Sequence, residues 1–197
     1  LFVEAVLAHA DDDTEPGTLA TLLSQALRAA SRYSGPGTRR ALLDRLLADD
    51  PTGGPEDSEP VPVRGGWGRL RAAAPGSDSQ LVRARAWLEA AGQAGRLDQE
   101  SRVQATVRIR LLLNGGLPGL ELDADLRWRA LTALARLDAV GSDELAAQRK
   151  ADPTAKGITH YLRASSSAPR EELKAEIFER LLNESSLSND HIDALIA

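Results

Sequence analysis

The sequence has no cysteine and no methionine, and aromatic residues make up only 4% of its 197 residues. Without cysteine the chain has no disulfide, no thiolate metal site and no cysteine nucleophile. A chain without disulfides suits the cytoplasm, and the cytoplasm is where we expect this protein to reside.

Long apolar runs and an excess of positive charge are also missing. No apolar stretch reaches the length of about 18 residues that a membrane-spanning helix needs. The net charge is −5, whereas nucleic-acid-binding proteins usually carry a basic stripe. We therefore expect neither a membrane nor a nucleic acid as a partner.

The opening residues, Leu1 to Glu4, include no initiator methionine and no basic signal-peptide region. We therefore expect the chain to begin inside a longer protein or after processing.

Residue types that form catalytic or metal centres are scattered along the chain. The three histidines, His9, His160 and His191, lack the spacing of a helical metal site, and no His-Glu-x-x-His sequence occurs. The acidic runs at 11–13 and 49–50 lack the spacing of a calcium loop. No Gly-x-Ser-x-Gly elbow and no phosphate-binding loop is present. We predict no catalytic residue, no cofactor-binding residue and no metal ligand in this chain.

What the sequence does contain is a repeated helical period. Between Thr18 and Tyr33, leucine and alanine recur every three or four residues and form one apolar stripe. A second stripe begins at Pro36, a favoured first-turn residue, and ends before Asp50. Because only Gly35 and its neighbours separate the two segments, we expect an antiparallel helical hairpin.

The stretch Asp50–Gly66 interrupts this pattern. Its four prolines and four glycines predict a loop, since proline and glycine both disfavour regular structure.

Helical segments resume after the loop. Expected caps or first-turn residues are Ser77 (with Gln80), Asp123, Ser142, Asp152-Pro153 and Pro169. The expected segments are Trp67–Ala74, 77–91, Leu97–Leu113, 123–137, Asp143–Ala151, 152–164, the segment from Pro169 on, and Ser188–Ala197.

Three of these segments carry predicted apolar faces. The segment Leu97–Leu113 has Val103, Val107 and Leu111 on one face. The segment that starts at Pro169 is expected to bury four apolar residues together: Leu173, Ile177, Phe178 and Leu181. The last segment has Ile192, Leu195 and Ile196 on one face.

Together these features predict an all-α fold. A series of amphipathic helices with short links is typical of stacked helical pairs, and no repeat of fixed length is visible. We therefore predict an irregular α-α superhelix of HEAT-like helical hairpins, formed by residues 1–197 as one domain.

The three tryptophans are expected to lie mostly in the core, because the side chain is large and apolar. The sequence Arg127-Trp128-Arg129 also admits a second interpretation. A tryptophan packed between two arginines can place an arginine on a concave surface, where it could meet a peptide carboxylate. Ordinary exposed helix arginines are the simpler interpretation. Arg127, Trp128 and Arg129 are retained as candidate peptide contacts.

Several phrases of the sequence resemble a known family in order and spacing. They are Arg32-Tyr33 followed by 39–43 (Arg-Arg-Ala-Leu-Leu), 73–81 (Ala-Ala-Pro-Gly-Ser-Asp-Ser-Gln-Leu), 117–120 (Leu-Pro-Gly-Leu) with 123–128 (Asp-Ala-Asp-Leu-Arg-Trp), and 152–157 with 171–176. They resemble the C-terminal domain of aminopeptidase N of the actinobacterial type, which is homologous to the C-terminal domain of the endoplasmic-reticulum aminopeptidases. The resemblance runs from Leu1 to Ala197.

The resemblance implies a part of a zinc-dependent exopeptidase that removes N-terminal residues from peptides. It implies that zinc is bound in an earlier, catalytic domain by His-Glu-x-x-His and a downstream Glu, none of which is in this chain. It also implies a helical superhelix that encloses the active-site chamber, controls peptide access and contacts the far end of the peptide. The partners would be the peptide and the catalytic domain of the same chain.

Two alternatives belong to other classes. One is a stand-alone α-solenoid module that binds a partner protein through a groove. The other is a helical repeat that binds nucleic acid, which the negative net charge disfavours.

Overall fold

The computed structural model describes residues 15–48 and 65–196, and every regular element in these ranges is helical. The elements are α2 (Pro16–Tyr33), α3 (Pro36–Leu47), α4 (Gly66–Ala72), α5 (Asp78–Ala91), the short 3-10 helix η1 (Ala94–Arg96), α6 (Gln99–Leu113), α7 (Ala124–Arg136), α8 (Ser142–Ala151), α9 (Ala155–Ser166), α10 (Glu171–Asn183) and α11 (Asn189–Ile196).

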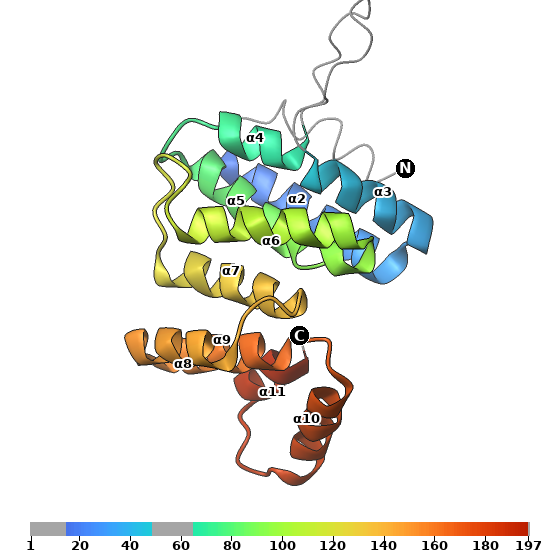
Figure 1. Ribbon diagram of the computed structural model, residues 1–197, viewed down its shortest axis with the longest axis vertical. Helices are drawn as coiled ribbons and strands as arrows, with labels where there is room; N and C mark the ends of the chain where they lie inside the picture. Colours follow the sequence, from blue (N-terminus) through green and yellow to red (C-terminus); the bar gives the residue numbers. More distant parts are fainter. Residues whose placement is uncertain (1–14, 49–64, 197) are drawn as a thin grey trace, which may run out of the picture.

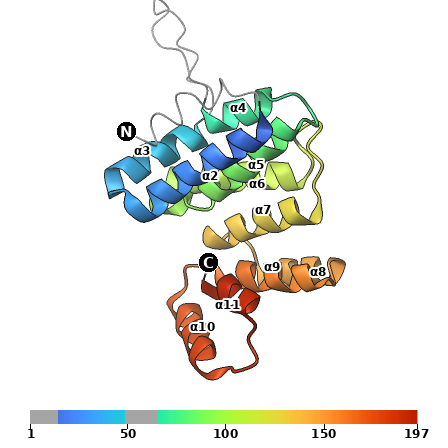
Figure 2. The ribbon, with the colours of Figure 1, turned by 180° about the vertical axis from the view of Figure 1, so that it is seen from behind.

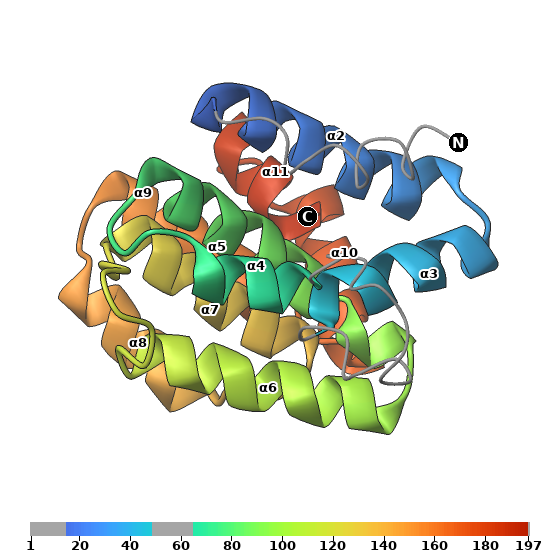
Figure 3. The same cartoon turned by 90° about the horizontal axis from the view of Figure 1, so that it is seen from above.

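The helices form a curved stack with a central series and flanking helices (Figure 1). Helices α2, α5, α7, α9 and α11 form the central series, in which each helix contacts the next. Helices α3, α4 and α6 flank α5, α6 also contacts α7, and α8 flanks α9. Figures 2 and 3 show α2 and α6 on opposite sides of α5. This arrangement confirms the predicted all-α superhelical fold.

Helices α2 and α3 form the helical hairpin that their apolar stripes predict. Proline occupies the first turn of both α2 and α3, and the carboxylate of Glu15 accepts a hydrogen bond from the backbone N–H of Thr18 at 2.6 Å. The guanidinium of Arg39 on α3 donates to the carbonyl oxygens of Ala30 and Ser31 at the end of α2. These bonds satisfy carbonyls that a helix end leaves unpaired, and they fix the two helices side by side.

All three tryptophans are buried, which confirms the core interpretation. The rings of Trp67 on α4 and Trp87 on α5 lie 4.6 Å apart at an angle of 49°, and the guanidinium of Arg108 lies over the Trp67 ring at 5.3 Å. Trp128 on α7 is 0% exposed and belongs to the same apolar cluster. These rings supply much of the apolar area that joins α4, α5 and α7.

The buried side chain of Gln80 connects the turn before α5 to the turn after α6 by hydrogen bonds. Its backbone N–H donates to the cap hydroxyl of Ser77, as predicted. Its side-chain oxygen accepts from the backbone N–H of Gly76 at 2.9 Å, and its side-chain nitrogen donates to the carbonyl of Pro118 at 3.0 Å. Gln80 is 1% exposed, so these bonds satisfy an amide that would be costly to bury unpaired. The turn before α5 is thereby tied to the turn after α6.

Two predicted caps were wrong. Ser142 is the first helical residue of α8, and Gly141 precedes it as the cap without a side-chain bond. The cap of α9 is Thr154, whose hydroxyl accepts from the N–H of Gly157 at 2.9 Å. Asp152 is unavailable as that cap because its carboxylate accepts from Trp128 and from Thr154.

Two predicted apolar faces also differ from the structure. Val103, Val107 and Leu111 share a face of α6, but all three are exposed, and the face that α6 buries carries Ala105, Ile109 and Leu112. Both faces are apolar, so periodicity alone does not decide which one packs.

In α10 the expected cluster does not form. Only Ile177 is buried, Leu173 and Leu181 are half-buried, and Phe178 is 59% exposed. In α11, Leu195 is buried as expected, together with Ala194, whereas Ile196 is exposed. The end of the stack therefore contributes little to the core.

Some predictions fall outside the described residues. They concern His9, the acidic runs at 11–13 and 49–50, and residues 50–64 of the predicted loop. Gly65 and Gly66, at the end of that stretch, are the cap and the first residue of α4. Within the described ranges no helix is both long enough and apolar enough to cross a lipid bilayer.

The contact between the two turns gives a testable prediction. Gly119 has φ +76°, and a Cβ added to it would lie 2.5 Å from Cβ of Pro75 and 2.6 Å from its carbonyl carbon. Gly115 has nearly the same φ, +72°, but a Cβ there would meet no atom within 4 Å. Gly115→Ala should therefore lower the free energy of unfolding by about 1 kcal/mol, the cost of left-handed backbone. Gly119→Ala should cost more than about twice as much, because steric overlap is added.

Urea unfolding followed by circular dichroism measures both values. Equal losses for the two variants would show that the turns do not press together.

Candidate functional site

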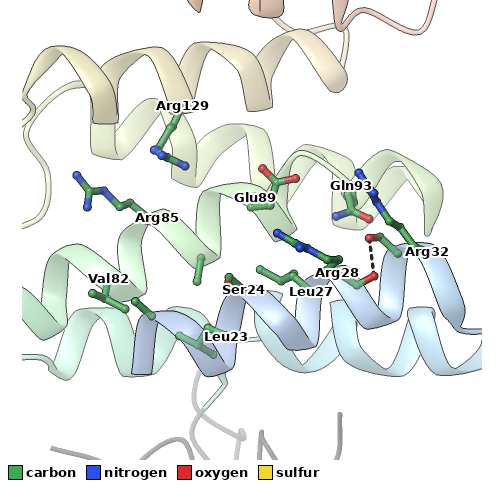
Figure 4. A pocket seen from close by; sticks show the side chains of 13 residues that line it. Leu23, Ser24, Leu27, Arg28, Arg32, Val82, Arg85, Glu89, Gln93 and Arg129 are labelled. Carbon is green, nitrogen blue, oxygen red and sulfur yellow. Dashed lines mark hydrogen bonds between the residues drawn. The ribbon is translucent and has the colours of Figure 1, made fainter. Parts of the chain in front are cut away.

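Three adjoining hollows lie along the central series, and together they form what we call the inner groove. The first, of about 410 Å³, lies between α2 and α5 beneath Arg129 of α7 (Figure 4). The second, of about 500 Å³, continues toward η1 and the start of α10 and shares Arg32, Glu89 and Gln93 with the first. The third, of about 70 Å³, lies between α5, α7 and α9 and shares Arg85, Glu89 and Arg129 with the first. The shared residues show that the hollows adjoin one another.

The inner groove is basic although the chain as a whole is acidic. Among the described residues that line the three hollows, Glu89 is the only acidic one. The basic ones are Arg28, Arg32, Arg85, Arg96, Arg102, Arg129, Arg136, Arg163 and Lys174. A hollow lined by charge of one sign concentrates the local field, so this surface favours anionic ligands.

Asp125, at the start of α7, organises the cations in the middle of the groove. Its carboxylate lies 2.9 Å from Nε of Arg129, 3.4 Å from Nη2 of Arg85 and 3.7 Å from Nζ of Lys156. Burial alone would raise the pKa of Asp125, but the hydrogen bond and charge of Arg129, with the charges of Lys156 and Arg85, lower it below its ordinary value. One carboxylate thus holds cations from α5, α7 and α9.

Behind this carboxylate, Trp128 joins α7 to α9. Its indole Nε1–H donates to Oδ2 of Asp152 at 2.8 Å, and the hydroxyl of Thr154 donates to Oδ1 at 2.7 Å. The bonds from Thr154 and Trp128 lower the pKa of Asp152. The His160 ring stacks on Trp128 with centroids 6.2 Å apart. Since His160 also lines the third hollow, Trp128 supports the wall of the groove from the core side.

The structure separates the three predicted peptide contacts. Arg129 is exposed and lines the groove, whereas Arg127 is half-buried and lines none of the three hollows. Trp128 is fully buried, so no ligand reaches its ring in this structure. That Arg127 or Arg129 contacts a peptide stays a prediction.

Sequence reasoning missed Asp125, Arg85 and Arg163 as members of this site. The pair Asp125 and Arg129 has the i, i+4 spacing of a helical ion pair, which is a usable signal. Arg85 and Arg163 lie on α5 and α9, and no spacing in the sequence links them to α7.

The histidines do not converge on a metal site in the described part of the chain. His160 lies on α9 and His191 on α11, and no group of three His, Cys, Asp or Glu residues within the described ranges could hold a metal ion. Burial lowers the pKa of His160, and Asp125 opposes this effect. The side chains that could bind a ligand in the groove include those of arginine and of His160.

Comparison with known proteins places the chain in a family. The sequence matches the ERAP1-like C-terminal domain family over residues 1–197, and the chain belongs to that family. It is also similar to Aminopeptidase N of Streptomyces lividans, with 30% identity over 198 residues. The match covers 100% of this chain and 20% of that protein, so the chain spans about a fifth of the length of this relative.

The Asp125 cluster predicts a pH-dependent contribution to stability. A carboxyl group whose pKa is lowered by folding stabilises the protein above its unfolded pKa of about 3.9, and the contribution disappears as the pH falls through the lower, folded value. Asp125→Asn should reduce the free energy of unfolding at pH 7 by about 1 to 3 kcal/mol, because it leaves clustered cations unpaired. The difference from wild type should shrink below about pH 4.

Denaturant unfolding between pH 3 and pH 7 measures this difference. The matched control is Asp193→Asn, an exposed residue of α11 that should change stability by less than about 0.5 kcal/mol at any pH. A loss from Asp125→Asn that is independent of pH would contradict the argument.

Proposed function

We propose that this chain is the non-catalytic C-terminal domain of a zinc-dependent aminopeptidase that removes N-terminal residues from peptides. In this proposal it encloses the active-site chamber and controls peptide access. Three observations support the proposal: membership of the ERAP1-like C-terminal domain family, similarity to a protein named Aminopeptidase N, and a basic groove in an acidic chain. The groove is the observation that carries the peptide-contacting part of the proposal.

The residues of this chain do not fit the zinc centre that the resemblance implies. The sequence has no His-Glu-x-x-His, and its described histidines lie on different helices. Zinc binding and the hydrolytic step therefore belong to the catalytic domain, which is the proposed partner in the same chain. The contribution proposed for this domain is binding and enclosure.

The physical basis of the binding is electrostatic. A peptide held by its N-terminus at a catalytic centre carries its negative carboxylate at the far end. Arginine is suited to this group because its planar guanidinium can donate two parallel hydrogen bonds to a carboxylate. Arg129 is exposed and reaches the first hollow from α7, and Arg28 and Arg32 reach it from α2 (Figure 4). A substrate long enough to extend into the groove would gain these contacts, and a short one would not.

A rigid wall is the second physical requirement of an enclosing domain. The middle of the central series supplies it, because α5 and α7 bury apolar residues against the helices on both sides of them. Such a stack can move as a body when two domains close over a substrate, with polar groups at the domain interface.

The proposal is tested on the full-length protein with two substrates, a short aminoacyl anilide and a longer peptide with a free C-terminal carboxylate. Arg129→Gln should raise KM for the peptide about tenfold or more, the loss expected for one charge-assisted hydrogen bond. It should leave the anilide kinetics unchanged. The control is Lys150→Gln, which removes one positive charge from the exposed surface of α8.

A companion measurement removes this segment and then supplies it as a separate protein. Loss of peptide trimming with zinc still bound supports the chamber proposal. Rates and peptide-length preference that stay the same would favour the alternative, a helical adaptor that binds a partner protein. The segment alone should hydrolyse neither substrate.

A further inference from the structure

The third hollow of the inner groove is small and enclosed by basic side chains. It has a volume of about 70 Å³, several times the roughly 10–15 Å³ that a cavity needs to hold one water molecule. That space can admit a small group such as a carboxylate or a phosphate. Its walls are Arg85, Leu88 and Glu89 of α5, Arg129, Thr132, Ala133 and Arg136 of α7, and His160 and Arg163 of α9.

Three nitrogen atoms of these walls are buried and have no hydrogen-bond partner. They are Nε of Arg85, Nε of Arg163 and Nε2 of His160. A buried donor left without a partner destabilises the folded protein, and it does so more strongly when it is charged. Such groups are rare in folded proteins, and a bound ion is one established reason for them. Here three of them come from two helices and line the same hollow.

The charges around the hollow do not balance. Glu89 is paired with Arg136 at 2.8 Å. Asp125 is shared by Arg85, Arg129 and the ring of His160, whose Nε2 lies 3.7 Å from Oδ1 of Asp125, beyond hydrogen-bond distance. These two carboxylates therefore balance only part of the positive charge of three guanidinium groups, those of Arg85, Arg129 and Arg136.

Arg163 adds a fourth guanidinium to the hollow. In the part of the chain that the structure describes, Arg163 pairs with no carboxylate. Lys156, which lies 3.7 Å from Asp125, adds another positive charge to the same cluster.

The excess of positive charge affects the pKa of His160. Burial is the largest cause of its lowered pKa, and the negative charge of Asp125 acts in the opposite direction. The charges of Lys156, Arg163 and Arg129 lower it further, and Asp152, bonded to Trp128, also interacts electrostatically with the ring. An anion in the hollow would offset these neighbouring cations.

We propose that the hollow between α5, α7 and α9 is an oxyanion-binding site, in which Arg85, Arg163 and His160 donate hydrogen bonds to a carboxylate or phosphate group. The geometry supplies three donors from two sides, and the bound charge would neutralise the surplus on the four guanidinium groups. The site does not depend on the chain being part of a peptidase. The oxyanion can be a free ion, or it can be the end of a longer ligand that lies in the adjoining 410 Å³ hollow, with which the site shares Arg85 and Arg129.

Proton NMR of the His160 ring in the 197-residue chain tests the proposal directly. His160→Gln assigns the resonance among the three histidines. Titrations are run at constant ionic strength with sodium chloride, sodium phosphate, an N-acetylated dipeptide with a free carboxylate, and the same dipeptide as its C-terminal amide. A saturating oxyanion should raise the pKa of His160 by about one unit, because an opposite charge within hydrogen-bonding distance favours the imidazolium.

Two substitutions at Arg163 separate the site from general screening. Arg163→Gln should weaken phosphate binding at least tenfold and abolish the pKa shift at concentrations that saturate the wild type. It breaks no ion pair seen in the structure, so the fold should persist, which circular dichroism checks. Arg163→Lys keeps the charge but lacks the Nε–H donor, and it should restore binding only in part. The control Lys150→Gln should titrate like the wild type.

Each result bears on the proposal. No shift of the His160 pKa with phosphate or with the dipeptide acid would overturn it. An equal shift in wild type and Arg163→Gln would also overturn it, because screening alone would then explain the effect. Tighter binding of the dipeptide acid than of phosphate or the amide would identify a chain end as the occupant. Tighter binding of phosphate would identify a free oxyanion.

Discussion

Helix α7 is buried from several directions at once, and the rest of the stack depends on that burial. It packs against α5, α6 and α9, and eight of its residues are buried, including Trp128 and Leu131. A helix enclosed in this way needs apolar residues over most of its circumference, which leaves few positions for charge. Asp125 and Arg129 occupy two of these positions one turn apart, so they form an ion pair, and Arg129 lines the groove. The requirements of the core thus determine where the charged cluster of the groove can form.

The same packing explains how an acidic chain acquires a basic surface. Net charge is a property of the whole composition, whereas the groove collects side chains from helices that the fold makes adjacent. Arg28, Arg85 and Arg163 are far apart in sequence and line adjoining hollows. Asp125 offsets only part of their charge. A surface with a surplus of guanidinium groups gives the domain a preference for anionic groups, and it needs no catalytic residue to exert that preference.

The fold was largely predictable from the sequence, and the site was not. Helices α2 and α3 could be predicted because their leucines form single stripes bounded by proline. The buried face of α6 could not, because Val107 and Ile109 lie on different apolar faces and only the neighbouring helices select between them. The cap at Asp152 failed because an indole 24 positions away uses its carboxylate. Arg129 was among the predicted contacts, but its relation to residues of α5 and α9 exists only after folding.

The arrangement of contacts also determines how the molecule comes apart. Within the described ranges, the larger contacts of the central series join each helix to the next one, so the stack resembles a one-dimensional array whose ends can open without the middle. Helix α10 buries Ile177 alone and makes only a small contact with α9, so it has little apolar area to lose. We expect amide hydrogens of α10 to exchange with solvent through local opening, and those of α7, with eight buried residues, to exchange through larger unfolding events. Among the described helices, we therefore expect α10 to open to proteases before α5 and α7 do.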